Sequence, residues 1–353
     1  MKVAVLGCGR VSARYREVLS KELNSRIEVT AVADLDLAKA QSMAQAVGGR
    51  PVQSIEDLVR TGPDLVFVMT ESGNHAKHVL ELLQNEINVI VEKPVALRIS
   101  DAIKMRNLAK EKGLMCGVIK QNRYNPAMKF VKSQLEKNRL GRLVSAGVRV
   151  HWCRYQDYYD DPWHGRWASD GGVLAQQAIH HLDALQWLGG EIESVCAYGT
   201  QRFNKLEAED TAVGIVRFKS GAVGTIEATT SARDRDYEAA VHLVGEKGLA
   251  KIAGQALNKL EQWHLLEMTE ADEGACEAHS QDVPTSYGLG HGPLISDALD
   301  ALERGDVHSP PINVDGAVTS LKLLHGLYRS METGRWVDLS DDQESSKLGL
   351  ETT

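Results

Sequence analysis

Short apolar runs and longer helical patterns alternate along the first third of the chain. Each run consists mainly of Val, Ile and Leu. Continuous apolar runs that lie between helices are typical of parallel strands covered on both faces. The pattern therefore predicts a doubly wound α/β domain. The predicted strands are residues 2–7, 27–34, 64–69, 87–92 and 114–119, with helices at 38–47 and 74–83 among them.

From about residue 121 onward, apolar and polar residues alternate with period two over long segments. The alternation runs through residues 143–152, 211–230 and 238–252. It indicates strands with one buried and one exposed face, so a largely antiparallel sheet is expected. Ser220-Gly221 and Glu246-Lys247-Gly248 have the composition of hairpin turns.

Three helices are also expected in this second part, at residues 172–188, 291–304 and 315–333. They would cover one face of the antiparallel sheet and leave the other to solvent or to a partner subunit. Association into a homodimer or homotetramer through that open face is a hypothesis. The end of the chain, residues 341–353, is polar and is expected to be a loose tail.

The composition narrows the class of protein. A chain of 353 residues favours two hydrophobic cores, and 43% hydrophobic with 25% charged residues is ordinary for a soluble globular protein. No apolar segment reaches the roughly 18 residues that a membrane span requires, so no membrane partner is expected. A formal net charge of -8, without a run of Lys and Arg, argues against nucleic acid as a partner. Five scattered cysteines without a C-x-x-C pair argue against disulfides and structural zinc, which favours a cytoplasmic location.

A glycine-rich turn follows the first predicted strand. Gly7 and Gly9 permit a tight turn and let backbone N–H groups approach a pyrophosphate at the start of a helix. The third glycine of the usual fingerprint is missing, and the small Ser12 takes its position. A glycine turn in another kind of α/β protein is the alternative. The strand-turn-helix setting favours a dinucleotide site, formed by Gly7, Gly9, Arg10, Val11 and Ser12.

An acidic residue ends the second predicted strand. Asp34 stands where a carboxylate accepts hydrogen bonds from the adenosine ribose of NAD, and its charge would oppose the extra phosphate of NADP. We therefore expect NAD in preference to NADP. The alternative role of Asp34 is to cap the following helix, which Asp36 could do equally well.

These patterns together predict the fold class and the domains. The class is α/β, with a Rossmann doubly wound parallel sheet followed by an α+β domain that has a large, mostly antiparallel sheet. Residues 1–120 are expected to bind NAD. Residues 121–340 are expected to bind the substrate and to mediate oligomerisation, and residues 341–353 to form the tail.

Charged residues follow directly on the apolar run of the fourth predicted strand, "NVIV" at residues 88–91. In open α/β sheets, ligands lie beyond the carboxyl ends of the strands, so Glu92 and Lys93 should face the cofactor. Pro94 stiffens the backbone and helps to aim the lysine. The alternative is a surface ion pair, which contributes little to stability.

Four segments of the chain carry a resemblance to a known family. They are the glycine turn, "TESGNHAKHV" (70–79), the Glu-Lys-Pro triplet and "GGVLAQQAIHHLDALQWLGG" (171–190). They resemble the Gfo/Idh/MocA oxidoreductases, named after glucose-fructose oxidoreductase and inositol dehydrogenase. The resemblance covers nearly the whole chain and implies NAD-dependent chemistry on a sugar or polyol. It also implies cofactor contacts by Thr70, Asn74, His75, Glu92 and Lys93.

The last of these segments resembles the catalytic helix of the family. Gln176, His180 and Asp183 have the spacing i, i+4, i+7, which places them on one side of a helix. Gln176 departs from the family, because it lacks the carboxylate of the polyol dehydrogenases. An asparagine often occupies this position in relatives that act on nucleotide sugars, so the resemblance favours that branch. A structural histidine is the alternative for His180, and the adjacent His181 would serve as well.

Hydride removal from a carbinol also requires loss of the hydroxyl proton, so a base must lie near the C–OH group. We expect His180 to be that base and Lys93 to hold the reacting oxygen, although the reverse assignment is open at this stage. His75 and His78 share a helical face, but a third ligand is lacking and no metal is expected.

Substrate contacts are expected from two kinds of segment. The loop at residues 153–172 is rich in aromatic rings and arginines, which suit sugar faces and phosphates, although a packed loop at a subunit interface is the alternative. The family also gathers substrate contacts near residues 120–126 and 287–293, where hinge or cap roles are the alternative. The candidates are Arg123, Tyr124, Tyr159, Trp163, Arg166, Gln176, Asp183, Tyr287 and His291.

The expected function is that of an NAD-dependent sugar dehydrogenase, acting on a secondary hydroxyl at the third carbon of a nucleotide-linked amino sugar. Three alternatives stay open. They are a dehydrogenase of a free sugar or inositol, a non-catalytic NAD-binding regulator, and a glycosidase that uses NAD in a transient oxidation.

Overall fold

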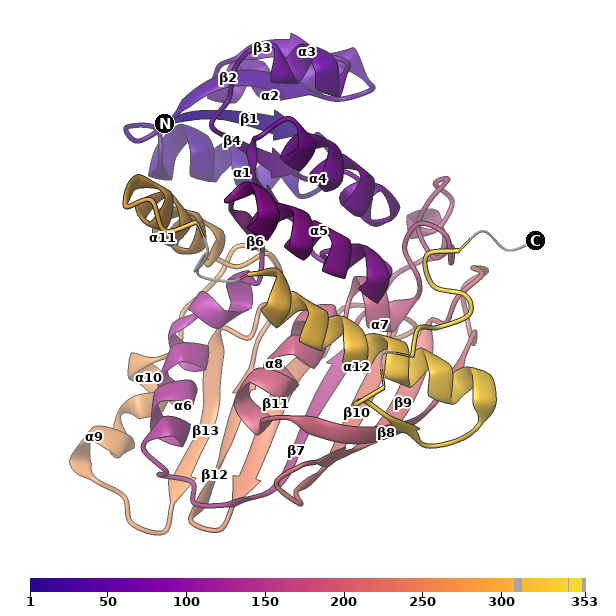
Figure 1. The fold of residues 1–353 in the computed structure, drawn as a ribbon. Helices are drawn as coiled ribbons and strands as arrows, with labels where there is room; N and C mark the ends of the chain where they lie inside the picture. Colours follow the sequence, from indigo (N-terminus) through magenta and orange to yellow (C-terminus); the bar gives the residue numbers. More distant parts are fainter. Residues whose placement is uncertain (308–312, 342, 351–353) are drawn as a thin grey trace. The chain divides into compact units, whose positions relative to one another are not determined.

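The structure, a computed structural model, describes residues 1–307, 313–341 and 343–350. The chain divides into two compact units (Figure 1). Unit 1 consists of Met1–Lys120 and His291–Val318, and unit 2 of Gln121–Gly290 and Thr319–Thr353. Residues 291–318, which the sequence assigns to the second domain, thus belong with the first.

Unit 1 contains a six-stranded, fully parallel sheet in the order β3-β2-β1-β4-β5-β6. Strands β1, β4 and β5 are buried almost without interruption, because helices cover both faces. The predicted doubly wound sheet is confirmed, while the three-residue β3 was too short to be recognised. The strands are β1 (Lys2–Leu6), β2 (Glu28–Ala33), β3 (Arg50–Val52), β4 (Leu65–Val68), β5 (Asn88–Val91) and β6 (Cys116–Val118).

The helices of unit 1 connect these strands. The strand order extends from β1 in two directions, and α1 packs against α2 while α4 packs against α5. Helices α2 and α4 match the predicted segments to within one residue at each end. The helices are α1 (Ser12–Glu17), the π-helical η1 (Val18–Glu22), α2 (Leu37–Val47), α3 (Ile55–Val59), the short η2 (Ser72–Asn74), α4 (His75–Gln84) and α5 (Ile99–Lys112).

A returning segment completes unit 1. It contains α11 (His291–Glu303) and the beginning of α12 (Val314–Thr333). Arg26, after η1, forms ion pairs with Asp300 at 2.6 Å and with Glu303 at 2.9 Å. Charge and packing of α11 against the η1 region thus explain why this segment joins the first unit.

Unit 2 contains an eight-stranded sheet in the order β13-β12-β11-β7-β10-β9-β8-β14. Only the β7–β10 pair is parallel, so the predicted, mostly antiparallel sheet is confirmed. Both predicted hairpins are present, and Gly221 provides a φ of +88° in the β9–β10 turn. The strands are β7 (Leu143–His151), β8 (Ile192–Thr200), β9 (Thr211–Phe218), β10 (Val223–Thr229), β11 (Glu238–Gly245), β12 (Gly248–Ala253), β13 (Lys259–Leu265) and β14 (Val337–Asp338).

Helices cover one face of this sheet. Figure 1 shows α6, α8 and α12 on the same side of the strands. The remaining short helices lie in loops, and within the described residues no helix is both long and apolar enough to cross a membrane. The helices of unit 2 before α12 are η3 (Gln121–Tyr124), α6 (Pro126–Glu136), η4 (Gln156–Tyr158), α7 (Val173–Gln176), α8 (Ile179–Gly189), α9 (Glu270–Glu273) and α10 (Ala275–Ala278).

The helix predicted over residues 172–188 is interrupted. It ends as α7 at Gln176 and restarts as α8 at Ile179. Glu209 lies beneath the first turn, where its backbone oxygen accepts the N–H of Val173 at 2.8 Å and its carboxylate accepts the N–H of Leu174 at 3.0 Å. At the break, the Val173 carbonyl oxygen accepts the N–H groups of both Gln177 at 3.1 Å and Ala178 at 2.8 Å, so a single continuous helix was the wrong prediction here.

Residues 343–350 of the polar end are packed on unit 2, so the prediction of a loose tail is wrong for this part, and residues 342 and 351–353 lie outside the described residues. Leu348 is fully buried. The backbone N–H of Ser345 donates to Nδ1 of His325 at 2.9 Å, and its hydroxyl donates to Glu332 at 2.6 Å. A buried leucine and a serine with two partners on α12 thus contribute to holding a segment whose composition is otherwise polar.

Candidate active site

In unit 1, each cofactor-binding candidate follows the carboxyl end of a parallel strand. Gly7 follows β1, Asp34 follows β2, Thr70 follows β4 and Glu92 follows β5. The strand order reverses between β1 and β4, which is the position where doubly wound sheets bind their ligands. The fold therefore collects these residues along one edge of the sheet.

The glycine turn has the geometry of a phosphate cradle. Gly7 has a φ of +98°, and a Cβ atom there would lie 2.7 Å from the backbone of Met69 and Thr70, so only glycine fits. A Cβ atom on Gly9 would meet no atom within 4 Å, which leaves the outer side of the turn open. Ser12 begins α1 and donates its hydroxyl to the Gly9 carbonyl at 2.6 Å. Arg10 and Val11 complete the turn, which fits a pyrophosphate at a helix start.

Asp34 and Asp36 divide the two roles that the sequence left open. Asp36 caps α2 by accepting the N–H of Ala38 at 3.0 Å. Asp34 accepts the N–H groups of Cys8 at 2.7 Å and of Asp36 at 2.8 Å, and its half-buried carboxylate retains further lone pairs for ribose hydroxyls. Burial, and secondarily the Asp34 charge, raises the pKa of the Cys8 thiol to about 12, so this cysteine stays neutral. The residues of this edge fit NAD.

The segment after β4 bonds mainly to itself. His75 is buried, with Nδ1 2.7 Å from the Pro94 carbonyl oxygen and Nε2 2.9 Å from that of Thr70. Asn74 donates to the Glu71 carboxylate. Burial lowers the pKa of His75, although the two carbonyl partners oppose that shift. Both ring nitrogens of His75 thus face backbone carbonyl groups. The contact of His75 with the cofactor, which the sequence predicts, stays a prediction.

Glu92 is buried, so the Glu-Lys pair is not a surface ion pair. Only 6% of Glu92 is exposed. Its carboxylate lies 3.1 Å from the Tyr15 hydroxyl, 3.3 Å from Nε2 of His291 and 3.2 Å from the backbone N–H of Lys93. Burial alone would raise the pKa of Glu92, but the hydrogen bonds and the charges of His291 and Lys93 lower it. The carboxylate is therefore held in its charged form.

The position of His291 differs from the substrate contact expected for it. It is fully buried at the start of α11 and bonds to Glu92. A ring without exposed surface acts through its neighbours, so the observed geometry favours a role in orienting Glu92.

In unit 2, His180 and its neighbour His181 have different environments. His180 is half-buried near the start of α8, and its Nε2 lies 3.2 Å from the amide nitrogen of Gln121. His181 is buried with its ring edge-on to Trp152 at 5.7 Å between ring centroids. His181 is thus the packed structural histidine of the pair. Gln176 ends α7 and is separated from His180 by the helix interruption.

Two predicted substrate contacts bind each other. Nε and Nη2 of Arg123 donate to the two oxygens of Asp183 at 2.8 and 2.7 Å, a bidentate pair. The hydroxyl of Ser320 donates to the same buried carboxylate at 2.9 Å. The Arg123 guanidinium also lies 5.2 Å from the Trp187 ring. Asp183 is thus held by two side chains of unit 2, and its contact with substrate stays a prediction.

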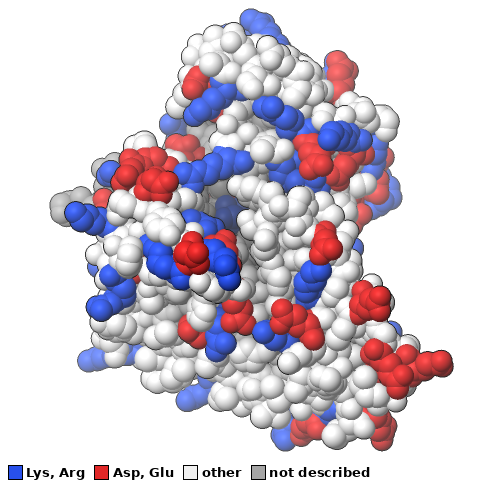
Figure 2. Space-filling view, turned by 180° about the vertical axis from the view of Figure 1, so that it is seen from behind, with Lys and Arg blue, Asp and Glu red and all other residues white. Residues whose placement is uncertain are grey.

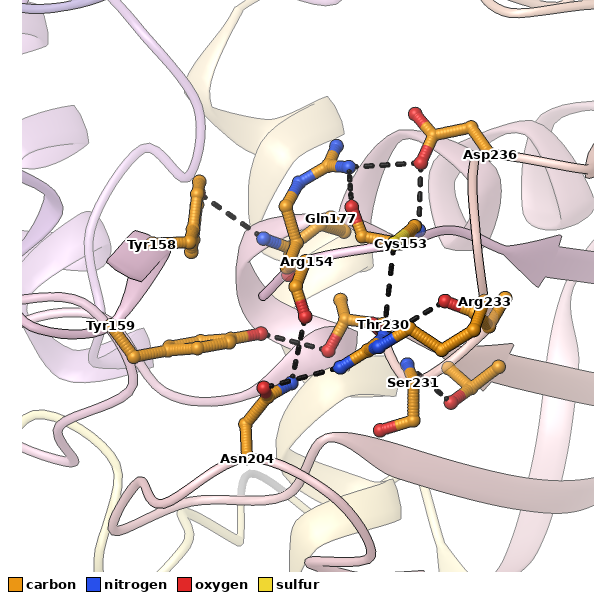
Figure 3. A network of polar contacts seen from close by, with 12 residues as sticks. Cys153, Arg154, Tyr158, Tyr159, Gln177, Asn204, Thr230, Ser231, Arg233 and Asp236 are labelled. Atoms are coloured by element: carbon orange, nitrogen blue, oxygen red, sulfur yellow. Dashed lines mark hydrogen bonds and ion pairs between the residues drawn. The ribbon is translucent and has the colours of Figure 1, made fainter. Parts of the chain in front are cut away.

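The aromatic loop after β7 is anchored to the ends of neighbouring strands (Figure 3). Tyr159 is buried and its hydroxyl lies 2.8 Å from that of Thr230. Burial raises the pKa of Tyr159 to about 12, so its hydroxyl stays neutral. Arg154 pairs with Asp236 at 2.9 Å. For Tyr159, this geometry favours the packed-loop alternative over a substrate contact.

Gln177 connects the aromatic loop to the junction between α7 and α8. Its side-chain amide donates to the Tyr158 hydroxyl at 3.2 Å, as Figure 3 shows. Asn204 and Arg233 close the other side of the loop, since Asn204 donates to the Arg154 carbonyl at 3.0 Å and accepts from Arg233 at 3.3 Å. The loop and the segment that carries His180 are therefore parts of one bonded network.

The remaining substrate candidates of unit 2 have partly exposed side chains. Trp163 stacks on His164 with 3.6 Å between ring centroids. Arg166 is exposed, 3.7 Å from Glu207. Lys129 lies over the Tyr124 ring at 4.2 Å, and Tyr287 is half-buried. Their contacts with substrate stay predictions.

Sequence reasoning missed two residues that touch the candidate catalytic groups. Tyr15 contacts Glu92 across 77 positions, and Gln121 contacts His180 across 59 positions. Tyr15 lies on the inner side of α1 and Gln121 precedes the Arg-Tyr pair at the unit boundary. No local pattern marked either as a partner, because their partners are brought to them only by the fold.

The parallel sheet, the glycine turn after β1, the Asp34 carboxylate after β2 and Lys93 after β5 are together typical of a nicotinamide-dependent oxidoreductase. More narrowly, the chain belongs to the Gfo/Idh/MocA family. Residues 1–120 match the model of the oxidoreductase family with an NAD-binding Rossmann fold, and residues 128–251 match the GFO/IDH/MocA C-terminal domain. The predicted resemblance is confirmed.

Known proteins of this family are similar over most of the chain. The structure of the WlbA dehydrogenase from Bordetella pertussis, solved with NADH and UDP-GlcNAcA, has 33% identity and a TM-score of 0.89, covering 96% of this chain and 97% of that one. The D-glucoside 3-dehydrogenase of Escherichia coli K12 is 24% identical, and the similarity covers 96% of this chain and 97% of that protein. The NAD-dependent scyllo-inositol 2-dehydrogenase of Bacillus subtilis 168 is 26% identical over 70% of this chain and 72% of that protein.

Proposed function

We propose that this oxidoreductase oxidises a secondary hydroxyl, at the third carbon, of a nucleotide-linked amino sugar with NAD. The observation that carries the proposal is the similarity to WlbA, which extends over 96% of the chain at 33% identity and concerns a protein bound to NADH and UDP-GlcNAcA. Reaction at the third carbon is also the activity of the D-glucoside 3-dehydrogenase relative.

When bound, NAD accepts the hydride from the carbinol carbon. The chain must then take the hydroxyl proton. His180, with one ring nitrogen at the amide of Gln121, is proposed as the base. Lys93, whose backbone N–H is fixed by Glu92, is proposed to hold the reacting oxygen by its charge.

A free inositol or sugar is the second candidate substrate, because inositol dehydrogenases are among the curated relatives. The residue Gln176 counts against it. A glutamine cannot ionise, so it cannot assist proton transfer as a carboxylate would.

The substrate can be identified by NADH absorbance with purified protein and NAD. The panel contains UDP-GlcNAcA, UDP-GlcNAc, free hexoses and inositols. We expect NADH formation with a UDP-linked amino sugar and little with the free compounds. NADH formation with an inositol alone would replace the proposal by the second candidate. Bound nucleotide without any NADH would favour a regulator, and release of a free sugar without net NADH would favour a glycosidase.

Substitution of the two candidate catalytic residues tests the mechanism. Lys93→Met should bind NADH as the wild type does, because the cofactor turn is intact, and lose turnover by about 100-fold or more. His180→Ala should lower turnover most at neutral pH, since the base is lost. Binding is measured by NADH fluorescence and turnover by absorbance. Near-normal turnover in either variant would remove that residue from the mechanism.

Self-association is proposed through the open face of the sheet in unit 2. This face exposes an apolar patch of four side chains on β8, β9 and β10, formed by Tyr198, Val213, Ile215 and Val223. Contiguous apolar side chains on one face are typical of protein interfaces. A cytoplasmic location stays an expectation from the sequence.

A further inference from the structure

We propose that Tyr15, Glu92 and His291 form a buried clamp that positions Lys93. These three residues, called the Glu92 clamp below, would be positioning residues that act on catalysis through the backbone of the turn after β5. The expected effect of the clamp on turnover rests on the proposed function, in which Lys93 holds the reacting oxygen.

The clamp directs three donors to one carboxylate. The Tyr15 hydroxyl donates to Oε1 of Glu92 at 3.1 Å and Nε2 of His291 lies 3.3 Å from the same oxygen. The second oxygen, Oε2, accepts the backbone N–H of Lys93 at 3.2 Å. Glu92 thus connects the side chains of two helices with the peptide group that begins the lysine residue.

All three side chains of the clamp lie in the interior of unit 1. Tyr15 and His291 are fully buried, and their rings pack edge to face with 5.7 Å between centroids. Tyr15 makes the same kind of contact with Phe67 of β4, also at 5.7 Å. Packed aromatic rings restrict the directions of the two donors, so the carboxylate has one well-defined orientation.

A buried carboxylate is unfavourable unless donors and opposite charge compensate it. A large apolar residue after β5 would avoid that desolvation penalty, so stability alone does not account for a glutamate here. The compensating groups, His291 and the Lys93 ammonium, hold the pKa of Glu92 low against the effect of burial. The arrangement is understandable if the carboxylate is required to fix the position of the lysine.

The turn is held from its other side as well. The carbonyl oxygen of Pro94 lies 2.7 Å from Nδ1 of His75, whose Nε2 bonds to the Thr70 carbonyl. Lys93 thus lies between two anchored groups, the Glu92 carboxylate and the Pro94 carbonyl. Its backbone has little freedom, while its half-buried side chain can still reach solvent and ligands.

The clamp also relates the lysine to the cofactor turn. Tyr15 lies on α1, the helix that begins at Ser12 directly after the glycine turn. Movement of α1 would therefore change the hydrogen bonding of Glu92. Within unit 1, the Glu92 carboxylate thus fixes the position of α1 relative to the turn after β5, which carries Lys93.

The test uses Tyr15→Phe, which removes one donor and keeps the ring. The control is Tyr328→Phe, because Tyr328 is equally buried and donates to Glu209 at the same 3.1 Å. Both variants, with NAD bound, are labelled with acetic anhydride, and mass spectrometry compares acylation of Lys93 with that of the exposed Lys104. We expect Tyr15→Phe to label severalfold faster at Lys93 and the control to label as wild type.

Turnover and cofactor binding provide the second measurement. With a UDP-linked amino sugar as substrate, Tyr15→Phe should lower kcat on the order of tenfold, the effect of a lost hydrogen bond to a charged group, without changing the affinity for NADH. His291→Gln, whose amide can still donate to Glu92, should retain more turnover than His291→Ala. General destabilisation would instead lower kcat and NADH binding together and would affect both His291 variants alike.

The two measurements separate the proposals. Unchanged acylation of Lys93 in Tyr15→Phe and in both His291 variants would overturn the clamp, whatever the substrate. Absence of turnover with every compound in wild type would overturn the proposed function, while faster acylation of Lys93 in the variants would still support the clamp.

Discussion

Neighbouring carboxylates of this protein have roles that only their partners reveal. Asp34 and Asp36 both follow β2, yet Asp36 caps α2 and Asp34 bonds to the glycine turn through Cys8. The cap is a local interaction within the helix start, whereas the contact of Asp34 spans 26 positions. Asp34 is accordingly the residue whose charge should govern the choice of cofactor.

Asp34→Asn should weaken discrimination against NADP. The amide retains an acceptor oxygen for Cys8 but loses the negative charge that would repel the 2′-phosphate. We expect the ratio of kcat/KM for NAD to kcat/KM for NADP to fall by about tenfold or more. Asp36→Asn, which keeps the helix cap, is the matched control and should leave the ratio as it is. An unchanged ratio in Asp34→Asn would show that this residue does not select the cofactor.

At the scale of elements, the buried Glu209 connects the start of α7 with β9. Glu209 precedes β9, is fully enclosed, and accepts the N–H of Leu174 and the hydroxyl of Tyr328. Burial raises the pKa of Glu209 from 4.5 to about 7, against the lowering effect of these hydrogen bonds. This carboxyl therefore titrates near neutral pH in the folded protein.

The raised pKa predicts a loss of stability as pH increases. Between about pH 4.5 and pH 7 the unfolded chain has released the Glu209 proton and the folded protein still holds it, so this group's contribution to the unfolding free energy declines as pH rises. Glu209→Gln cannot ionise. The unfolding free energy of Glu209→Gln, relative to that of wild type, should therefore increase by on the order of 1–3 kcal/mol from pH 5 to pH 8.

Denaturant unfolding of both proteins at pH 5 and pH 8 measures this difference. Glu207→Gln, an exposed glutamate on the same segment, is the control and should follow wild type at both pH values. A constant difference between Glu209→Gln and wild type across this range would show that Glu209 does not change its charge there.

At the scale of the whole molecule, the open face of the sheet in unit 2 has two kinds of surface. One part is the apolar patch on β8, β9 and β10. The other is a network of cross-strand ion pairs, in which Arg149 contacts Glu227 and Glu238, and Lys251 contacts Glu238. Figure 2, seen from behind, shows acidic and basic side chains interspersed with broad uncharged areas. Such a surface suits another protein better than a polyanion.

Val213→Arg should disrupt self-association through the apolar patch. Val213 is 51% exposed at the centre of β9, and a buried unpaired charge would strongly oppose an interface. We expect a dimer or larger assembly for wild type and a monomer for the variant by light scattering. The control is Val144→Arg, because Val144 is 53% exposed on β7 outside the patch. A monomeric wild type would remove the proposal.

Local patterns were sufficient for most of the architecture. Buried runs at β1, β4 and β5, the alternation in β9 and the turn at Gly221 depend on neighbours in sequence, and the structure confirms the parallel and antiparallel sheets. The helix interruption after Gln176 was not predictable in this way. There the Val173 carbonyl oxygen accepts the N–H groups of both Gln177 and Ala178, a widened turn that the apolar periodicity does not mark.

The candidate site was recognised by residue type and position, but the partners of its residues were not. Lys93 and the glycine turn follow strand ends, which the sequence indicates directly. Asp183 was expected to face substrate, and the structure adds Arg123 and Ser320 as partners across 60 and 137 positions. A spacing pattern describes one helix face and contains no information on which distant side chain packs against it.

By itself, the amino-acid sequence determined the family, the two kinds of sheet and the edge at which NAD is expected, because each follows from short-range periodicity and motif. Only the tertiary structure decided that residues 291–318 return to the first unit and that Tyr15 and His291 meet at Glu92. In these contacts, donors from distant segments compensate a buried charge, and which side chains become buried together depends on the folded chain. No short stretch of sequence specifies which distant residues meet.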